Sequence, residues 1–151
     1  MKILVRLPNW LGDMVMSVGF VNQLPDFFPG AEISVIAKKG IHQLLSFFPP
    51  TKNQFVFSKE EFQGVKGLVQ FGNQVKQAEN FDLFFCLPDS FSAAIMGAAT
   101  GADKRIGYKK ELRQVMLTDS FSKPEGLHRV EEYIQLLELF TNRKGQAINV
   151  S

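Results

Sequence analysis

The chain has 151 residues and a formal net charge of +2. A chain of this length buries roughly 68–70% of its unfolded surface, so one domain with a substantial core is expected. A hydrophobic share of 45% and a charged share of 21% are typical of a globular protein. The small net charge gives no support for nucleic-acid binding, and no apolar run approaches the roughly 18 residues that span a bilayer.

The single cysteine, Cys86, cannot form an internal disulfide, which suits a reducing compartment. The apolar run before Pro8 is too short for a signal peptide, and Asp13 interrupts the segment that follows. We therefore expect a cytoplasmic protein, with a peripheral position at a membrane left open.

The first elements in chain order are a strand and a helix. Residues 2–7 form a short apolar run that predicts a buried strand, and residues 12–28 follow a helical period. Pro25 should kink or end that helix. Residues 31–37 predict a second strand, and residues 40–48 predict a short helix.

The middle of the chain continues the alternation. Residues 54–58 predict a third strand, and residues 64–80 predict a helix that Gly67 and Gly72 weaken. Residues 81–87 form a near-continuous apolar run, which is typical of a strand covered on both faces.

A strand-to-helix turn opens the last third. Ser90 is expected to cap a helix over residues 91–100. Residues 104–108 predict a strand, and residues 113–118 predict either another strand or an extended loop.

The chain closes with a helix over residues 127–141 and a predicted strand over residues 147–150. Strands and helices thus alternate throughout. This order predicts an α/β fold, with a Rossmann-like, doubly wound parallel sheet, right-handed crossovers and helices on both faces.

The corner from Leu7 to Asp13 (LPNWLGD) carries the strongest chemical signal. It follows the carboxyl end of the first strand, where ligands bind in open α/β sheets. Gly12 lacks a Cβ, so a ligand or backbone can approach closely. Asp13 lies in the first helical turn, whose dipole favours the charged carboxylate. This predicts a general base for a hydroxyl group, and the alternative is a helix cap.

Other sites are not supported by the sequence. It contains no G-x-G-x-x-G and no G-x-x-x-x-G-K-[ST] motif, which argues against dinucleotide and P-loop binding. His42 and His128 have no acid or cysteine at ligand spacing, so no metal site is expected. Cys86 lies within an apolar strand and is expected to be a buried structural thiol.

Four segments of the chain resemble one protein family, and they occur in the same order as in that family. Residues 3–17 (ILVRLPNWLGDMVMS), residues 87–94 (LPDSFSAA), residues 104–108 (KRIGY) and residues 128–133 (HRVEEY) are similar to segments of the ADP-heptose:lipopolysaccharide heptosyltransferases, which form glycosyltransferase family 9. The likeness is greatest to the heptosyltransferase II type. It spans most of the chain, although Asp89 stands where the family often has Asn. Glu132 stands where Arg is frequent, and we expect it at an exposed helix position.

The resemblance implies the N-terminal half of a two-domain GT-B enzyme, residues 1–151, that binds the acceptor. The donor-binding C-terminal domain would be absent from this chain, and the isolated chain inactive. Such enzymes transfer heptose from ADP-heptose to the lipopolysaccharide inner core with inversion, without metal or cofactor. Asp13 would then be the base that takes a proton from the acceptor hydroxyl. The lipid-borne acceptor leaves open a peripheral position at the inner face of the bacterial inner membrane.

The resemblance also assigns the acceptor cleft. The stretch from residue 101 to residue 130 carries seven Lys or Arg and four Asp or Glu, which suggests a basic surface for an anionic acceptor. Guanidinium groups pair with carboxylates and phosphates in a bidentate way, and adjacent lysines could assist. The predicted acceptor-binding residues are Asn9, Trp10, Gly12, Asp89, Ser90, Arg105 and Arg113, with Lys109 and Lys110 as helpers. Ser90 and Asp89 have a helix cap as their alternative role.

Two other functions stay open on the sequence. One is a related glycosyltransferase with another nucleotide-sugar donor, which the Asp13 corner suits equally well. The other is a small non-catalytic α/β module that binds a nucleotide or a flavin. The absence of a phosphate-cradling first loop argues against the second.

Overall fold

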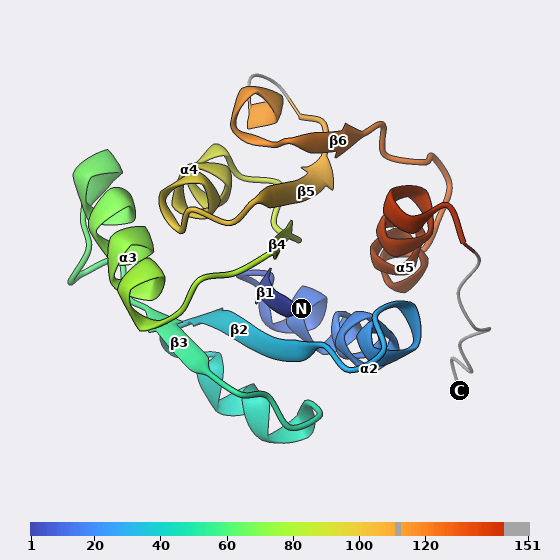
Figure 1. Ribbon diagram of the computed structural model, residues 1–151, viewed down its shortest axis with the longest axis horizontal. Coiled ribbons are helices and arrows are strands. Elements are labelled where there is room, and N and C mark those ends of the chain that lie inside the picture. The colour runs from blue at the N-terminus through green and yellow to red at the C-terminus, as the bar shows by residue number, and fades with distance from the viewer. Residues whose placement is uncertain (111–112, 144–151) are drawn as a thin grey trace.

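The computed structural model describes residues 1–110 and 113–143, so the strand predicted over residues 147–150 lies outside the described residues. Its centre is a six-stranded parallel sheet with the strand order β3-β2-β1-β4-β5-β6 (Figure 1). The order reverses direction between β1 and β4, as in a doubly wound fold. The strands are β1 (Lys2–Arg6), β2 (Glu32–Lys38), β3 (Gln54–Phe57), β4 (Leu83–Cys86), β5 (Lys104–Tyr108) and β6 (Asp119–Phe121).

Helices cover both faces of the sheet. Figure 1 shows α2 (Val18–Phe27) and α5 (Arg129–Thr141) together on one side, and α3 (Gly64–Ala78) and α4 (Phe91–Ala99) together on the other. The short helix α1 (Leu11–Met16) links β1 to α2. The predicted α/β architecture with a doubly wound parallel sheet is confirmed.

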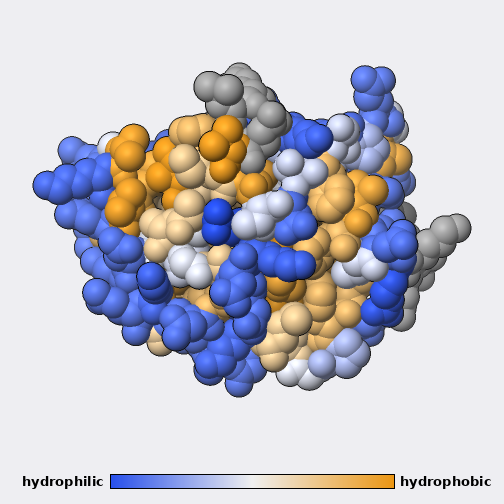
Figure 2. Space-filling view, turned by 45° about the horizontal axis from the view of Figure 1, so that its top comes forward, coloured by the Kyte–Doolittle hydropathy of each residue, from blue (hydrophilic) through white to orange (hydrophobic). Residues whose placement is uncertain are grey.

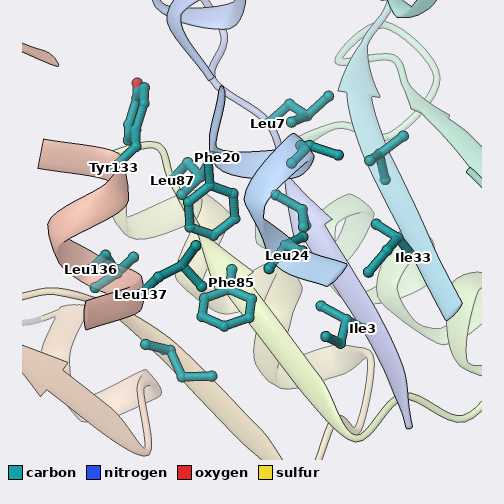
Figure 3. Packing of buried hydrophobic residues seen from close by; sticks show 14 of the residues in the cluster. Ile3, Leu7, Phe20, Leu24, Ile33, Phe85, Leu87, Tyr133, Leu136 and Leu137 are labelled. Atoms are coloured by element: carbon teal, nitrogen blue, oxygen red, sulfur yellow. The ribbon is translucent and has the colours of Figure 1, made fainter. Parts of the chain in front are cut away.

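Two hydrophobic clusters follow from the period of two along the strands. In β1, Ile3 and Val5 face the cluster under α2 and α5, whereas Leu4 faces the cluster under α3 and α4. Figure 3 shows Phe20 of α2 and Phe85 of β4 next to each other between α2 and α5, and their ring centroids lie 5.3 Å apart. The sheet is therefore buried on both faces, as the apolar strand sequences predict.

The helix predicted over residues 12–28 is divided at Ser17. The Ser17 amide donates to the carbonyls of Asp13 (3.0 Å) and Met14 (3.1 Å), and its hydroxyl donates to Met14 O at 2.6 Å. Ser17 is thus both the C-cap of α1 and the N-cap of α2, which starts at the next residue. Pro25 does not end the helix, one of the two effects expected of it, because it lies inside α2, which continues to Phe27.

Three further elements differ from prediction. The helix predicted over residues 40–48 is a 3₁₀-helix, η1 (His42–Phe47), and residues 113–118 form neither a strand nor a loop but begin with a second 3₁₀-helix, η2 (Arg113–Met116). The strand β6 follows η2 and was not predicted, because its sequence Asp-Ser-Phe has no apolar run. It extends the sheet by pairing with β5.

Within the described ranges, no helix is long and apolar enough to cross a membrane. On the face drawn in Figure 2, hydrophobic residues form several patches with hydrophilic residues between them.

Candidate functional site

A cleft of about 300 Å³ lies at the carboxyl ends of β1, β4 and β5. It stands where the strand order reverses, the position at which doubly wound sheets bind their ligands. Its walls come from the β1–α1 corner, the β4–α4 turn, the segment after β5 and the start of α5. The lining residues are Pro8, Asn9, Trp10, Asp13, Leu87, Pro88, Asp89, Ser90, Lys110, Arg129 and Tyr133.

Asp13 lies in the first turn of α1, and its side chain lines this cleft. The N-cap position of α1 is Trp10, so Asp13 is the third residue of the helix and its backbone lies in the first turn. Its Oδ1 lies 3.4 Å from Nε of Arg129, and the two side chains are 27% and 35% exposed. The carboxylate is therefore held by a cation yet remains accessible to a ligand.

Arg129 is a site residue that the sequence reasoning missed. It is the first residue of α5, and besides Asp13 it contacts Glu132 Oε2 (3.2 Å) and Asp89 Oδ2 (3.8 Å). Burial alone would lower the pKa of this guanidinium, but the negative charges of Tyr133, when ionised, Asp13, Glu132 and Asp89 raise it above its usual value. The sequence signal that could have pointed to Arg129 was its position in the HRVEEY segment (residues 128–133), which resembles the heptosyltransferase family.

Asp89 and Ser90 stand in the turn after β4, as expected. Asp89 Oδ2 accepts a hydrogen bond from Lys123 Nζ at 2.6 Å, which forms a salt bridge. Ser90 Oγ accepts from the amide of Ala93 at 3.2 Å, so Ser90 is the N-cap of α4. The predicted cap role of Ser90 is confirmed, and the same residue lines the cleft.

The two predicted arginine clamps lie away from the cleft lining. Arg113 is only 1% exposed. Its guanidinium donates to the carbonyls of Pro88, Ser90 (3.4 Å) and Tyr108 (2.9 Å), so it braces the turn that carries Asp89. Arg105 is the second residue of β5, far from the carboxyl end of that strand, and donates to Met116 O (2.8 Å) and Ala102 O (3.3 Å).

Tyr133 joins the core to the cleft. Its ring is buried, as predicted, but it also lines the cleft, and Figure 3 shows its hydroxyl pointing away from the packed side chains below it. Burial raises the pKa of this phenol, so the hydroxyl stays protonated at neutral pH.

Glu132 is not the exposed residue that was expected. It is partly buried, because its carboxylate pairs with Arg129 and its carbonyl accepts from the Tyr108 hydroxyl.

The three remaining candidates differ in their surroundings. Trp10 is 73% exposed, so one face of its indole is free to stack on a ligand. Asn9 lines the cleft and accepts a hydrogen bond from Arg6 through its Oδ1. Gly12 is not among the lining residues, and a Cβ at this position would meet nothing within 4 Å.

The donor set of the cleft suits an anionic or hydroxyl-bearing ligand better than a metal ion. Over residues 1–110 and 113–143, no group of three or more His, Cys, Asp or Glu side chains is placed to hold a metal. The cleft instead combines the carboxylates of Asp13 and Asp89 with the cations of Lys110 and Arg129. This arrangement can take a proton from a hydroxyl while binding negative charge beside it.

Known proteins are similar to this chain in sequence and in structure. The lipopolysaccharide heptosyltransferase 2 of Escherichia coli is 31% identical over 143 residues, which cover 90% of this chain and 40% of that protein. The lipooligosaccharide heptosyltransferase 2 of Haemophilus ducreyi is 31% identical over 138 residues, with 90% and 39% covered. The chain thus spans about 40% of the length of these relatives.

Two solved structures of glycosyltransferases are also similar to this chain. A family 9 glycosyltransferase from Veillonella parvula superposes with a TM-score of 0.84 at 18% identity, covering 99% of this chain and 45% of that one. The Escherichia coli ADP-heptose lipopolysaccharide heptosyltransferase II superposes with a TM-score of 0.73 at 30% identity, with 91% and 40% covered. Residues 69–149 match the family described as glycosyltransferase family 9 (heptosyltransferase). The chain therefore belongs to glycosyltransferase family 9.

Proposed function

We propose that this chain is the acceptor-binding half of an inverting heptosyltransferase, with Asp13 as the catalytic base. The observation that carries the proposal is the position of Asp13. Its carboxylate lines the cleft at the switch point of the sheet and lies in the first turn of a helix. The relatives above are named as lipopolysaccharide or lipooligosaccharide heptosyltransferases, and the name of one includes ADP-heptose.

In the proposed reaction, an acceptor hydroxyl binds in the cleft and donates its proton to Asp13. The oxygen forms a bond to the anomeric carbon of ADP-heptose while the bond from that carbon to the diphosphate breaks. Attack on the face opposite the leaving group inverts the anomeric centre. For proton transfer, the acceptor oxygen must lie about 2.6–3.2 Å from a carboxylate oxygen of Asp13.

Arg129 gives Asp13 a fixed orientation in this proposal. The ion pair from Arg129 Nε to Asp13 Oδ1 leaves the other carboxylate oxygen for the acceptor. Trp10, at the rim, offers a face on which a sugar ring can stack. Asn9 and Ser90 supply polar groups to the same walls.

The acceptor in this proposal is an anionic lipopolysaccharide core. Lys110 and Arg129 supply the positive charge of the cleft lining, in place of the arginines expected from the sequence. An acceptor carried on a lipid would bring the protein to the inner face of the inner membrane without a spanning segment. The donor, ADP-heptose, would be held by a second domain of the GT-B plan.

The proposal is tested by acceptor-dependent release of ADP from ADP-heptose by the full-length gene product. Asp13→Ala should reduce kcat by about 100-fold or more, since a general base contributes that much. Asp26→Ala is the matched control, because Asp26 is an exposed acid in the neighbouring helix α2. It should leave kcat unchanged.

Each outcome has a distinct meaning. A folded Asp13→Ala protein with full activity would overturn the assignment of the base. A wild type without activity on ADP-heptose, but active in a screen of other nucleotide sugars, would point to a related transferase with another donor. A wild type without activity on any donor would overturn the transferase proposal.

A further inference from the structure

A second cavity, of about 360 Å³, lies on the other face of the sheet at the carboxyl end of β1. It opens between the end of β3 and the first turns of α3 and α4. Its polar lining includes Arg6, Asn9, Lys59 and Ser92, and its apolar walls include Phe57 and Phe62. None of its lining residues is an acid, so its only formal charges are positive.

Arg6 is the unusual residue of this cavity. It is the last residue of β1 and only 3% exposed. Its Nη1 donates to Leu7 O at 2.6 Å and its Nη2 donates to Asn9 Oδ1, but its Nε is buried without a partner. Among the described residues, no carboxylate lies within 4.0 Å of this guanidinium.

A buried guanidinium without a counter-ion costs free energy, because the lost hydration is not replaced by an opposite charge. Burial lowers the pKa of Arg6 to about 10, and the ionised form of Cys86 opposes this shift. The group nevertheless remains charged at neutral pH. The protein therefore holds a positive charge at the wall of a cavity, and within residues 1–110 and 113–143 no acidic side chain forms an ion pair with it.

The other groups that line the cavity also favour a negatively charged ligand. Gly64 opens α3, and Ser92 lies in the first turn of α4, where the next amide, that of Ala93, already donates to Ser90 Oγ. The first turns of helices carry amides without intrahelical acceptors and a partial positive charge, both of which favour anions. Lys59 adds a second cation from the loop after β3.

We propose that this cavity is a second binding site, which takes a phosphate or carboxylate group attached to an organic ligand. Arg6 supplies the counter-charge, and the first-turn amides of Gly64 and Ser92 supply hydrogen-bond donors. The aromatic walls of Phe57 and Phe62 receive the carbon part of the ligand. Asn9 lines both this cavity and the cleft of Asp13, so the two sites meet at one residue. The inference rests on this geometry and not on the proposed transferase reaction.

The test is an NMR titration of the ¹⁵N-labelled chain with two probes, inorganic phosphate and phenyl phosphate, at constant ionic strength. Saturable shifts are expected at the amides of Gly64, Ser92 and Ala93. Tighter binding of phenyl phosphate would assign the site to an organic ester, as proposed. Equal or tighter binding of inorganic phosphate would overturn that part and identify a site for the free ion.

Two variants and a control separate the cavity from general charge effects. Arg6→Gln should weaken binding by about tenfold or more, as expected for loss of a charged hydrogen-bond donor. Ser92→Glu places a carboxylate at the cavity in the first turn of α4, where the helix dipole favours it, and should weaken binding similarly. Lys66→Gln, at an exposed position of α3 outside the lining, should change affinity by less than about twofold because its charge is screened.

Three results would overturn the proposal. The first is no saturable shift with either probe. The second is unchanged affinity in a folded Ser92→Glu variant, which decides the question even if Arg6→Gln does not fold. The third is a shift pattern confined to Trp10, Asp13 and Arg129, which would place the anion in the cleft instead.

Discussion

Arg129 is the cation on which the acidic side chains of the cleft converge. Asp13 belongs to α1, Asp89 to the turn after β4, and Glu132 to the next turn of α5, and all three lie within 3.8 Å of its guanidinium. A change at this one residue therefore reaches both walls of the cleft. Its effect on activity should exceed its effect on stability, because partly exposed ion pairs contribute little to folding.

Arg129→Gln should lower kcat/KM of the full-length gene product by about tenfold or more, since the carboxylate of Asp13 loses its orientation. The free energy of unfolding should change by less than about 1 kcal/mol, as for other partly exposed pairs. Steady-state kinetics and urea denaturation give the two quantities.

Arg129→Lys is the conservative comparison, and it should restore part of the activity because the charge is kept while the planar fork is lost. Equal losses of stability and activity in Arg129→Gln would instead assign Arg129 a purely structural role.

Cys86 provides a prediction about reactivity. Its side chain is buried in β4, and burial raises the pKa of the thiol, because the charged thiolate is disfavoured there. The neutral thiol is a poor nucleophile. A thiol reagent such as dithionitrobenzoate at pH 8 should therefore leave the native protein unmodified and react with one equivalent in denaturant. Rapid reaction of the native protein would show that β4 is accessible.

The residues of the site were predictable to different degrees. Asp13 was found because a strand, a glycine and an acid adjoin in sequence, which fixes their place at the sheet edge. Arg129 was missed because its partner Asp13 is distant along the chain and becomes a neighbour only when α5 packs. Arg113 was read as an anion clamp because a sequence cannot show that its donors already bind carbonyls.

At the scale of elements, two glycines on helices have opposite surroundings. A Cβ at Gly97 of α4 would lie 2.4 Å from Cε1 of Phe84, a fully buried ring in β4. A Cβ at Gly12 of α1 would meet nothing within 4 Å. The first glycine sets the distance between a helix and the sheet, whereas the second leaves space open beside the β1–α1 corner.

Gly97→Ala should lower the free energy of unfolding by about 1–3 kcal/mol, the usual cost of overpacking a core. Gly12→Ala should be neutral or stabilising by up to about 1 kcal/mol, because alanine favours a helix. Urea denaturation measures both. An unchanged midpoint for Gly97→Ala would mean that α4 does not lie against Phe84 as closely as described.

The elements predicted correctly are those in which the spacing of hydrophobic residues along the sequence matches the pattern of buried positions. Strands β1 to β5 and helices α3 to α5 were found, with ends displaced by a few residues. Gly72 was read as weakening α3, yet it is the point at which α3 approaches Ala99 of α4. The break at Ser17 and the strand β6 were missed, because single hydrogen bonds and pairing with a neighbour leave no periodic signal.

At the scale of the whole molecule, the two candidate sites and a cluster of ion pairs lie at opposite ends of the strands. The cleft and the second cavity both lie at the carboxyl ends of the strands. The opposite edge holds an ion cluster, in which Glu79, after α3, pairs with Lys2 (3.0 Å) of β1 and Lys52 (2.7 Å). Asn53, before β3, donates to the same carboxylate at 2.7 Å. This cluster ties three segments together without contributing to either site.

Glu79 should therefore control stability in acid without affecting activity. Hydrogen bonds from Lys52 and Lys2 lower the pKa of Glu79 from its ordinary 4.5 in the folded protein. A carboxyl whose pKa falls on folding stabilises the native state above its unfolded pKa, and that stabilisation is lost as the pH drops through the folded pKa. The advantage of the wild type over Glu79→Gln should be constant from neutral pH to about pH 5 and should shrink below pH 4.5.

The measurement is the free energy of unfolding of both proteins from pH 7 to pH 3. Glu60→Gln, at an exposed position after β3, is the control for the loss of one surface carboxylate. Added salt should reduce the Glu79 effect, because charges near the surface are screened. Since Glu79 lies at the edge opposite the cleft, kcat/KM should be the same in both proteins at pH 7. A difference between them that did not change with pH would show that Glu79 acts by packing rather than by charge.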